Sequence, residues 1–133
     1  MGTLIDASVA IAIERQGLDP KELLAIGADT ESGLAAITAS ELLHGLFRTS
    51  NVAQRERREA FLEILFSILP VIPFDLGIAR IHARLGADLA SQGKPMGNHD
   101  LIVAATAIAR DWEVATHDLR SFPRIPGLRL ARW

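Results

Sequence analysis

The sequence predicts an α/β domain whose sheet is mainly parallel and covered by helices on both faces. Short apolar segments typical of buried strands alternate with helix-length segments along the chain. A chain of 133 residues can bury about two thirds of its unfolded surface, which suits one domain spanning residues 1–133. No internal repeat, low-complexity tract or linker divides the chain.

The first half of the chain is expected to repeat a strand, a turn and a helix. The elements expected are a strand at 3–5, a helix from Asp6 and Ser8 to about Gly17, a short helix opened by Asp19-Pro20, and a strand at 33–37. Thr38 and Glu41 have the spacing of a capping box, in which they would bond the first turn of the next helix.

The second half continues the alternation. The elements expected are a helix at 52–69, a strand at 71–72, a helix from Asp75 to about Gln92, a helix at 101–111 opened by His99-Asp100, and strands at 114–116 and 128–130. The 52–69 helix is charged in its first half and has an apolar stripe in its second. We therefore expect it to pack at one end and project at the other.

Composition excludes several classes of protein. Without cysteine there is no disulfide or thiolate zinc site, so oxygen or imidazole must hold any metal. The longest apolar stretch, Leu101 to Ala109, is about half of a membrane span, and no basic start precedes Asp6, so we expect a cytoplasmic protein with no membrane partner. An aromatic content of 5% without tyrosine argues against a base-stacking platform. Arginine supplies 12 of the 14 basic residues, which favours phosphate or carboxylate partners.

Four carboxylates are predicted at the carboxyl edge of the sheet, where parallel sheets bind ligands. They are Asp6, Glu41, Asp100 and Asp118. Each one alone is also explained as a helix cap or as a partner of the helix dipole. Together they would repel one another unless a cation neutralised them, and oxygen ligands point to Mg²⁺ or Mn²⁺.

The segments around these acids resemble a known family. They are LIDAS (4–8), ITASEL (37–42), NHDLIVAATA (98–107), THD (116–118) and FPRIPGL (122–128). In this order they resemble PIN-domain proteins, specifically VapC-like ribonuclease toxins of type II toxin–antitoxin systems. The resemblance covers almost the whole chain. It implies a three-layer α/β/α sandwich and a metal-dependent endoribonuclease that leaves 5′-phosphate and 3′-hydroxyl ends.

The resemblance also assigns roles. Asp6, Glu41 and Asp100 would be metal-site acids, and Asp118 would be a second-metal ligand or would position water. Ser8 and Thr116 would be supporting hydroxyls. It further implies an RNA substrate, an inhibitory VapB-like antitoxin, a homodimer, and contact with operator DNA only through the antitoxin.

Residues beside the motifs have two interpretations each. His99 and His117 precede site acids, and they either help to bind RNA or tune the site, or are ordinary loop histidines. The four basic residues that flank the motifs either contact phosphate or are solvated surface charges; they are Arg15, Lys94, Arg120 and Arg124. The apolar helix residues are mostly core, and some could line a groove or dimer face; they are Leu42, Leu43, Leu46, Phe47, Phe61, Leu65 and Phe66.

Three other functions compete with the toxin. A phosphatase of the haloacid dehalogenase type needs a second Asp two residues after the first, where this chain has Ser8. A catalytically silent PIN-like binding module would act only through its partner and would not cut RNA. A housekeeping RNA-processing nuclease would cut RNA but have no antitoxin.

Overall fold

The computed structural model describes residues 1–26 and 31–131 of the chain. Its strands are β1 (Gly2–Ile5), β2 (Glu31–Ala35), β3 (Val71–Ile72), β4 (Glu113–Ala115) and β5 (Leu130–Ala131). Its α-helices are α1 (Ala7–Arg15), α2 (Glu22–Ile26), α3 (Ala36–Phe47), α4 (Val52–Ile68), α5 (Leu76–Ser91) and α6 (Asn98–Arg110). A single 3₁₀ turn covers Phe122–Arg124. The predicted alternation of strands and helices is confirmed, with boundaries that differ by a few residues.

The strands form one parallel sheet in the order β3-β2-β1-β4-β5. Leu4 of the central strand β1 pairs with Gly33 of β2 on one side and with Val114 of β4 on the other. The order runs outward from β1 in one direction to β3 and in the other to β5. The carboxyl end of β1 is therefore a topological switch point, the place where such sheets bind ligands.

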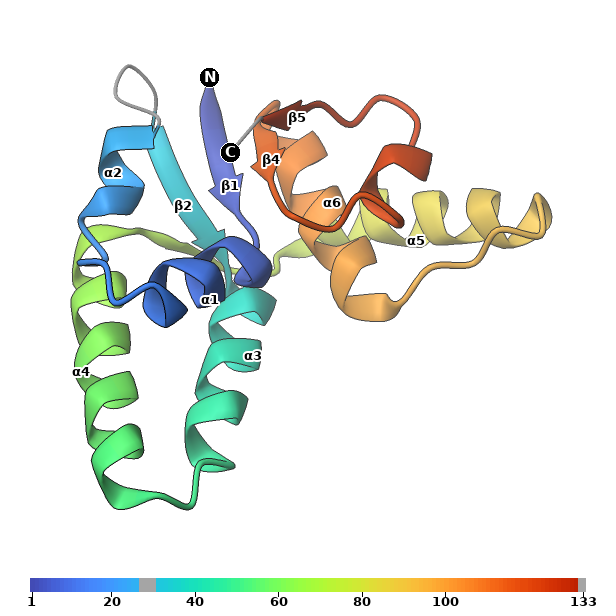
Figure 1. Cartoon of the computed structure of the whole chain (residues 1–133). Coiled ribbons are helices and arrows are strands. Elements are labelled where there is room, and N and C mark those ends of the chain that lie inside the picture. The colour runs from blue at the N-terminus through green and yellow to red at the C-terminus, as the bar shows by residue number, and fades with distance from the viewer. Residues whose placement is uncertain (27–30, 132–133) are drawn as a thin grey trace.

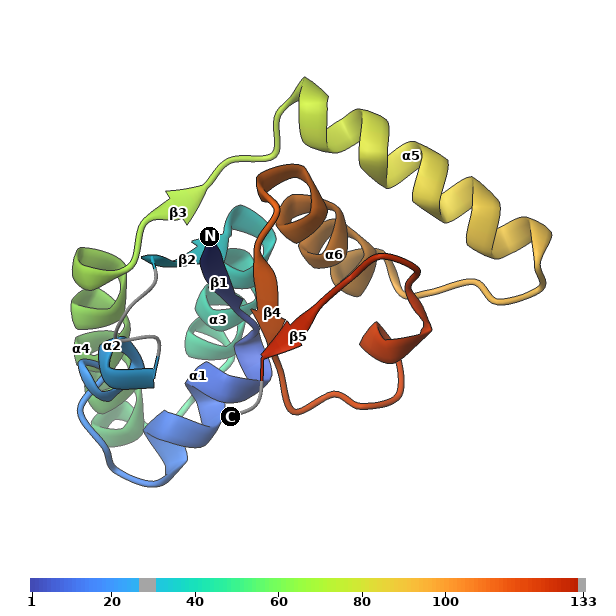
Figure 2. The ribbon, with the colours of Figure 1, turned by 90° about the horizontal axis from the view of Figure 1, so that it is seen from above.

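Alternate residues of each strand enter two separate cores. Ile5, Leu34 and Ala115 lie in a core with α1, α2, α3 and α4. Their strand neighbours Leu4, Ala35 and Val114 lie in a second core with α5 and α6. Figure 2 shows α5 and α6 on one side of the sheet and α1, α2 and α4 on the other. The predicted three-layer α/β/α sandwich is confirmed, and both faces of the short apolar strands are buried, as parallel sheets require.

Helix α3 begins earlier than the sequence pattern indicates. The strand β2 ends at Ala35, which is also the helix N-cap, so Ile37 is helical rather than extended. Thr38 and Glu41 lie inside α3, and the predicted capping box is wrong. The Thr38 hydroxyl is fully buried and makes no hydrogen bond in the described part of the chain. The apolar residues that follow still face the core, because a shifted start leaves the helical period unchanged.

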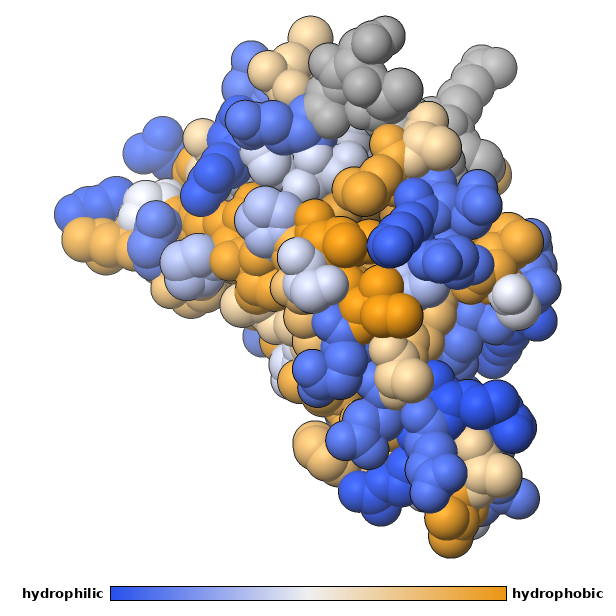
Figure 3. All heavy atoms as spheres, turned by 90° about the vertical axis from the view of Figure 1, so that its left-hand side faces the viewer, coloured by the Kyte–Doolittle hydropathy of each residue, from blue (hydrophilic) through white to orange (hydrophobic). Residues whose placement is uncertain are grey.

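Helix α4 packs and projects as expected. Phe61, Leu62 and Leu65 are buried, whereas residues 52–57 are exposed. Together with the end of α3, the first half of α4 forms the lower extension of the molecule (Figure 1). Figure 3 shows hydrophilic side chains over this extension and more apolar surface nearer the sheet.

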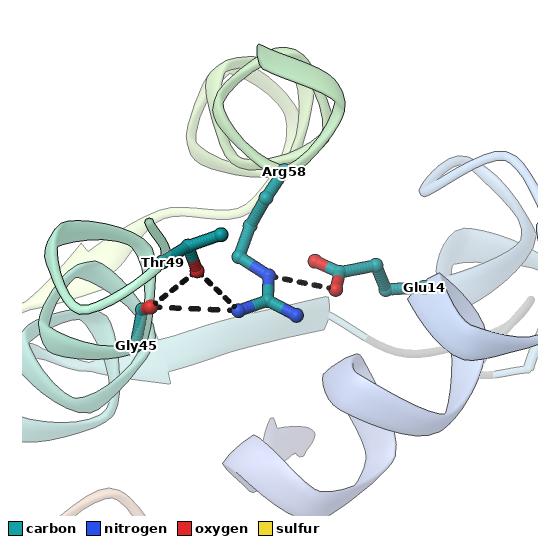
Figure 4. A network of polar contacts seen from close by, with 4 residues as sticks. All are labelled: Glu14, Gly45, Thr49 and Arg58. Carbon is teal, nitrogen blue, oxygen red and sulfur yellow. Dashed lines mark hydrogen bonds and ion pairs between the residues drawn. The ribbon is translucent and has the colours of Figure 1, made fainter. Parts of the chain in front are cut away.

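Arg58 links α4 to two other helices (Figure 4). Its Nε donates to Glu14 Oε1 of α1 at 3.0 Å, and its Nη1 donates to Thr49 Oγ1 at 2.9 Å. Thr49 Oγ1 in turn donates to the Gly45 carbonyl of α3 at 2.9 Å. Because the Arg58 side chain is partly buried, this network fixes how α1, α3 and α4 approach one another below the sheet.

In the described ranges, no helix is long and apolar enough to span a membrane.

Figure 1 shows α5 extending away from the sheet beside α6. Its start is capped as predicted, because Asp75 Oδ1 accepts the Ile78 N–H at 2.9 Å. It ends before Gly93, whose φ of +69° suits glycine. Helix α6 begins at Asn98, three residues earlier than expected.

Candidate functional site

The site lies at the carboxyl edge of the sheet, around the switch point. Asp6 follows β1 directly, and its backbone N–H donates to the Ala115 carbonyl at the end of β4 at 2.9 Å. The loop after β4 carries Asp118, while α3 and α6 bring Glu41 and Asp100 to the same edge. The fold thus gathers the four predicted carboxylates, which are far apart in the sequence.

Two hydroxyl groups hold the Asp6 carboxylate. Ser8 Oγ and Thr116 Oγ1 each donate to Asp6 Oδ2, both at 2.8 Å. The Asp6 side chain is only 7% exposed, so its orientation is set by these bonds rather than by water. Oδ1 accepts no hydrogen bond from the described residues, which leaves it available to a ligand. Ser8 and Thr116 thus contact the carboxylate that they are predicted to support.

Asp118 is positioned by the chain that surrounds it. Its backbone N–H donates to Thr116 Oγ1 at 2.9 Å, and the His117 N–H donates to Ser8 Oγ at 3.0 Å. The Asp118 Oδ1 accepts the N–H groups of Arg120 and Ser121 at 2.9 and 3.1 Å. The same two hydroxyls therefore connect Asp6 with the loop that presents Asp118.

Glu41 and Asp100 approach the site from helices. Glu41 lies in the second turn of α3, and its Oε1 is 3.3 Å from His99 Nδ1 in the first turn of α6. Asp100 is the third residue of α6 and is partly buried. The Glu41–His99 contact joins α3 to α6 across the site, a pairing that no sequence spacing indicated.

The four carboxylates interact electrostatically. Burial raises the pKa of Glu41 above its ordinary value, with Asp6 and Asp100 adding to the rise and His99 opposing it. Burial also raises the pKa of Asp100, to which the charges of Asp6 and Asp118 contribute. By contrast, the backbone N–H of Arg120 lowers the pKa of Asp118, and so does the N–H of Ser121. Negative charge therefore accumulates around Asp6 at neutral pH.

Helix capping explains at most one of these acids. Asp6 is the N-cap of α1 but makes no side-chain capping bond, and Glu41 is internal to α3. Asp100 is preceded by Gly97 at the N-cap of α6. Only Asp118 accepts backbone N–H groups, as Asp75 does elsewhere. The costly proximity of Asp6, Glu41 and Asp100 thus calls for another reason.

The donor set fits a hard divalent cation. Within residues 1–26 and 31–131, no three His, Asp or Glu side chains are placed so that together they could hold a metal ion. Mg²⁺ does not need three protein ligands, because it keeps several waters and takes only one or two carboxylates from the protein. The unbonded Oδ1 of Asp6 and the raised pKa values of Glu41 and Asp100 agree with such an open site.

The basic residues that flank the site make fewer contacts than its carboxylates do. Arg124 Nη2 donates weakly to the Pro95 carbonyl at 3.4 Å, which ties the loop after β4 to the loop before α6. Lys94 and Arg120 are exposed, and Arg120 also lowers the pKa of Asp118 through its charge. Arg15 lies farther along α1, beside a groove described below.

Two substitutions should change metal-free stability in opposite directions. In EDTA at neutral pH, Asp100→Asn should raise the melting temperature by about 1–5 °C, since partly exposed charge interactions contribute about 0.2–1 kcal/mol. Asp118→Asn should lower it, because the backbone N–H groups favour the ionised carboxylate. Thermal unfolding followed by circular dichroism measures both.

The pH dependence gives each substitution a signature. The pKa of Asp100 is raised in the folded protein, so its ionised form destabilises the fold at any pH above the pKa of the unfolded chain. The rise in melting temperature caused by Asp100→Asn should therefore disappear as the pH falls through the pKa that Asp100 has in the folded protein. The lowered pKa of Asp118 means that its contribution is present above its unfolded pKa and is lost on acidification. A lower melting temperature for Asp100→Asn in EDTA would instead indicate a stabilising helix-dipole role.

Comparisons with known proteins agree with this fold. The family model of the PIN domain matches residues 3–128. The chain is 34% identical over 130 residues to "Ribonuclease VapC1" of Rickettsia felis, covering 98% of this chain and 95% of that protein. It is 35% identical over 100 residues to the "tRNA(fMet)-specific endonuclease VapC" of Salmonella typhimurium, covering 75% and 74%. The chain belongs to the PIN-domain family, and within it to the VapC-like group.

Solved structures show the same architecture. The DNA-bound VapBC structure from Salmonella typhimurium contains a chain with a TM-score of 0.87 and 28% identity, with 100% of this chain and 98% of that one covered. VapBC2 from Rickettsia felis, bound to a DNA fragment from its promoter, gives a TM-score of 0.88 at 24% identity, with 100% and 99% covered. The second likeness supports the fold alone.

Proposed function

We propose that this chain is a VapC-type endoribonuclease, the toxin of a toxin–antitoxin pair, which hydrolyses RNA phosphodiester bonds at the carboxylates around Asp6. One observation carries the assignment: a buried carboxylate held by Ser8 and Thr116 lies near Glu41 and Asp100, whose pKa values are raised by burial and by the charge of Asp6. The names of the VapC relatives give the reaction class.

The residues of the site would have different roles in the reaction. Asp6, Glu41 and Asp100 would hold Mg²⁺ or Mn²⁺, directly or through water. Such an ion, when bound, supplies Lewis-acid stabilisation for the phosphate and lowers the pKa of water. Ser8 and Thr116 fix the Asp6 carboxylate, which leaves Oδ1 for the ion. Asp118, kept ionised by backbone N–H groups, either orients the attacking water or contributes to a second ion. Cleavage would leave 5′-phosphate and 3′-hydroxyl ends.

A groove between α1, α3 and α4 supports an antitoxin partner. A cavity of about 130 Å³ opens beside Glu41 and is lined by Ile11, Leu42 and Leu62 among others. A larger hollow of about 570 Å³ continues along α1 and α4, past Arg15 and Phe61. Glu14 and Arg58 border both. This mixed apolar and charged groove suits an extended or helical tail of a VapB-like antitoxin, with a basic side chain near Glu41. Operator DNA would then be contacted through the antitoxin, and the complex would act in the cytoplasm.

A second surface supports a homodimer. A shallow groove of about 650 Å³ runs along α5 and the end of α6, with Ile81, Leu85 and Ile108 between Arg80, Arg84 and Asp88. Because Arg80 and Asp88 lie two helical turns apart on one face, an antiparallel α5 from a second copy would place opposite charges together. Light scattering of the purified chain measures the expected twofold mass.

RNA cleavage with defined ions tests the proposed function. Purified protein should cut total cellular RNA at discrete positions in Mg²⁺ or Mn²⁺, and EDTA should reduce cleavage to background because the carboxylates alone repel phosphate. Mapping the cut ends should show 5′-phosphates.

The same experiment separates the alternatives. No cleavage by folded, ion-supplied protein would favour the silent binding module. Cleavage by a protein that no co-encoded small protein inhibits would favour the housekeeping nuclease.

A further inference from the structure

One exposed aromatic ring lies on the same edge of the sheet as the carboxylates. Among the five phenylalanines, Phe74 and Phe47 are exposed, by 47% and 65%. Arg55 lies over the ring of Phe47 at 5.7 Å, whereas no Lys or Arg in the described ranges lies over Phe74. Phe74 follows β3, so the parallel sheet places it at the carboxyl edge that also carries Asp6. Its exposure needs a reason, since burying the ring would stabilise the fold.

A short chain of contacts joins this ring to the site. The rings of Phe74 and His82 meet edge to face with centroids 5.8 Å apart. His82 Nε2 lies 3.0 Å from Asn98 Oδ1, and Asn98 begins α6. The next residue, His99, contacts Glu41 at 3.3 Å. Phe74 and His82 are therefore connected to the start of α6, the helix that carries Asp100.

The backbone beside Phe74 and the neighbouring His82 ring are restrained before any ligand arrives. Pro73 fixes the backbone before it, and the next residue, Asp75, caps α5 through its side chain. The Asp75 carbonyl also accepts the Ala79 N–H at 2.8 Å. His82 is restrained by its contacts with Phe74 and Asn98. A ligand would lose little side-chain entropy on binding here.

We propose that Phe74, supported by His82, is a stacking subsite for one base of the RNA strand, next to the cleaved phosphodiester bond. The proposal rests on the proposed function, because that function brings single-stranded RNA to this edge. Unpaired bases stack on exposed aromatic rings, and stacking tolerates any base because every base has a π-face. The low aromatic content argues against a base-stacking platform of several rings, whereas this subsite needs one ring.

Binding of RNA to cleavage-deficient protein tests the subsite. In an Asp100→Asn background with Mg²⁺, a short fluorescent single-stranded RNA should bind roughly tenfold more weakly after Phe74→Ala. Phe74→Tyr should bind within about twofold of the parent, because it keeps the ring. Phe74→Leu keeps the apolar volume but loses the π-face, so its affinity should resemble that of Phe74→Ala.

Phe47→Ala is the matched control, since it removes the other exposed phenylalanine ring, at the end of α3. It should leave RNA affinity within about twofold of the parent. Equal losses for the two alanine variants, or full affinity for Phe74→Ala or Phe74→Leu, would overturn the subsite. A loss of affinity that accompanies a change in mass by light scattering would assign Phe74 to a contact between copies instead. If the Asp100→Asn parent binds no RNA and the wild type cleaves none, both the proposed function and the stacking subsite are wrong.

Discussion

Replacing Asp6 by Asn should lower the rate of RNA cleavage at least a hundredfold in saturating Mg²⁺ while the protein stays folded. The rate should fall because removing the charge of a ligand weakens binding of the ion. The bound ion would stabilise the charge of the transition state by several kcal/mol. The fold should survive because Ser8 and Thr116 donate to the same oxygen, Oδ2. The carbonyl oxygen of an asparagine can accept both bonds. Initial cleavage rates of a labelled RNA and the unfolding midpoint measure the two effects.

Asp19→Asn provides the matched control for this charge removal. Asp19 is exposed, and its Oδ1 accepts the Lys21 N–H at 2.9 Å in the turn before α2. Its replacement makes the same chemical change away from the carboxyl edge and should leave the cleavage rate within about twofold. Near wild-type cleavage by Asp6→Asn would remove Asp6 from the ion site and, with it, the central assignment.

The order of strands and helices was predictable because its signals are local. Short apolar runs buried on both faces differ from the longer periodic helices, and Asp75 and Gly93 are the usual residues for starting and ending a helix. The convergence of Asp6 and Glu41 was predictable for the same reason. Asp6 directly follows β1 and Glu41 lies in the helix after β2, and a parallel sheet brings those strand ends together. Asp100 follows no strand, and it was expected at this edge only as an acid at the start of a helix.

The start of α3 and the contacts across the site were not predictable from spacing. Thr38 to Glu41 has capping-box spacing, but tertiary packing continues the helix back to Ala36 and buries Thr38. The Glu41–His99 and Ser8–Asp6–Thr116 contacts depend on side-chain directions in separate elements. The Arg58 network also joins residues that are distant in the sequence, so no local sequence pattern predicts it.

Replacing Phe122 by Ala should destabilise the folded protein by about 3–5 kcal/mol, the range for truncating a fully buried Phe. The Phe122 side chain is 0% exposed and belongs to the core with Leu4, Val114 and Ile125. It lies in the 3₁₀ turn Phe122–Arg124, directly after the segment whose N–H groups hold Asp118. Urea unfolding measures the free energy of unfolding, and the loss should appear as a lower midpoint with an unchanged slope.

The position of Phe122 links the core to the site in a way that a second readout can detect. The Arg120 and Ser121 N–H groups can hold Asp118 only while the turn after them stays anchored to the sheet. The cleavage rate of Phe122→Ala should therefore fall by a larger factor than the fraction of protein that is folded. Phe122→Leu, which leaves a smaller cavity, should recover much of both properties. A variant that loses stability but keeps full activity per folded molecule would show that the turn holds Asp118 without the Phe122 anchor.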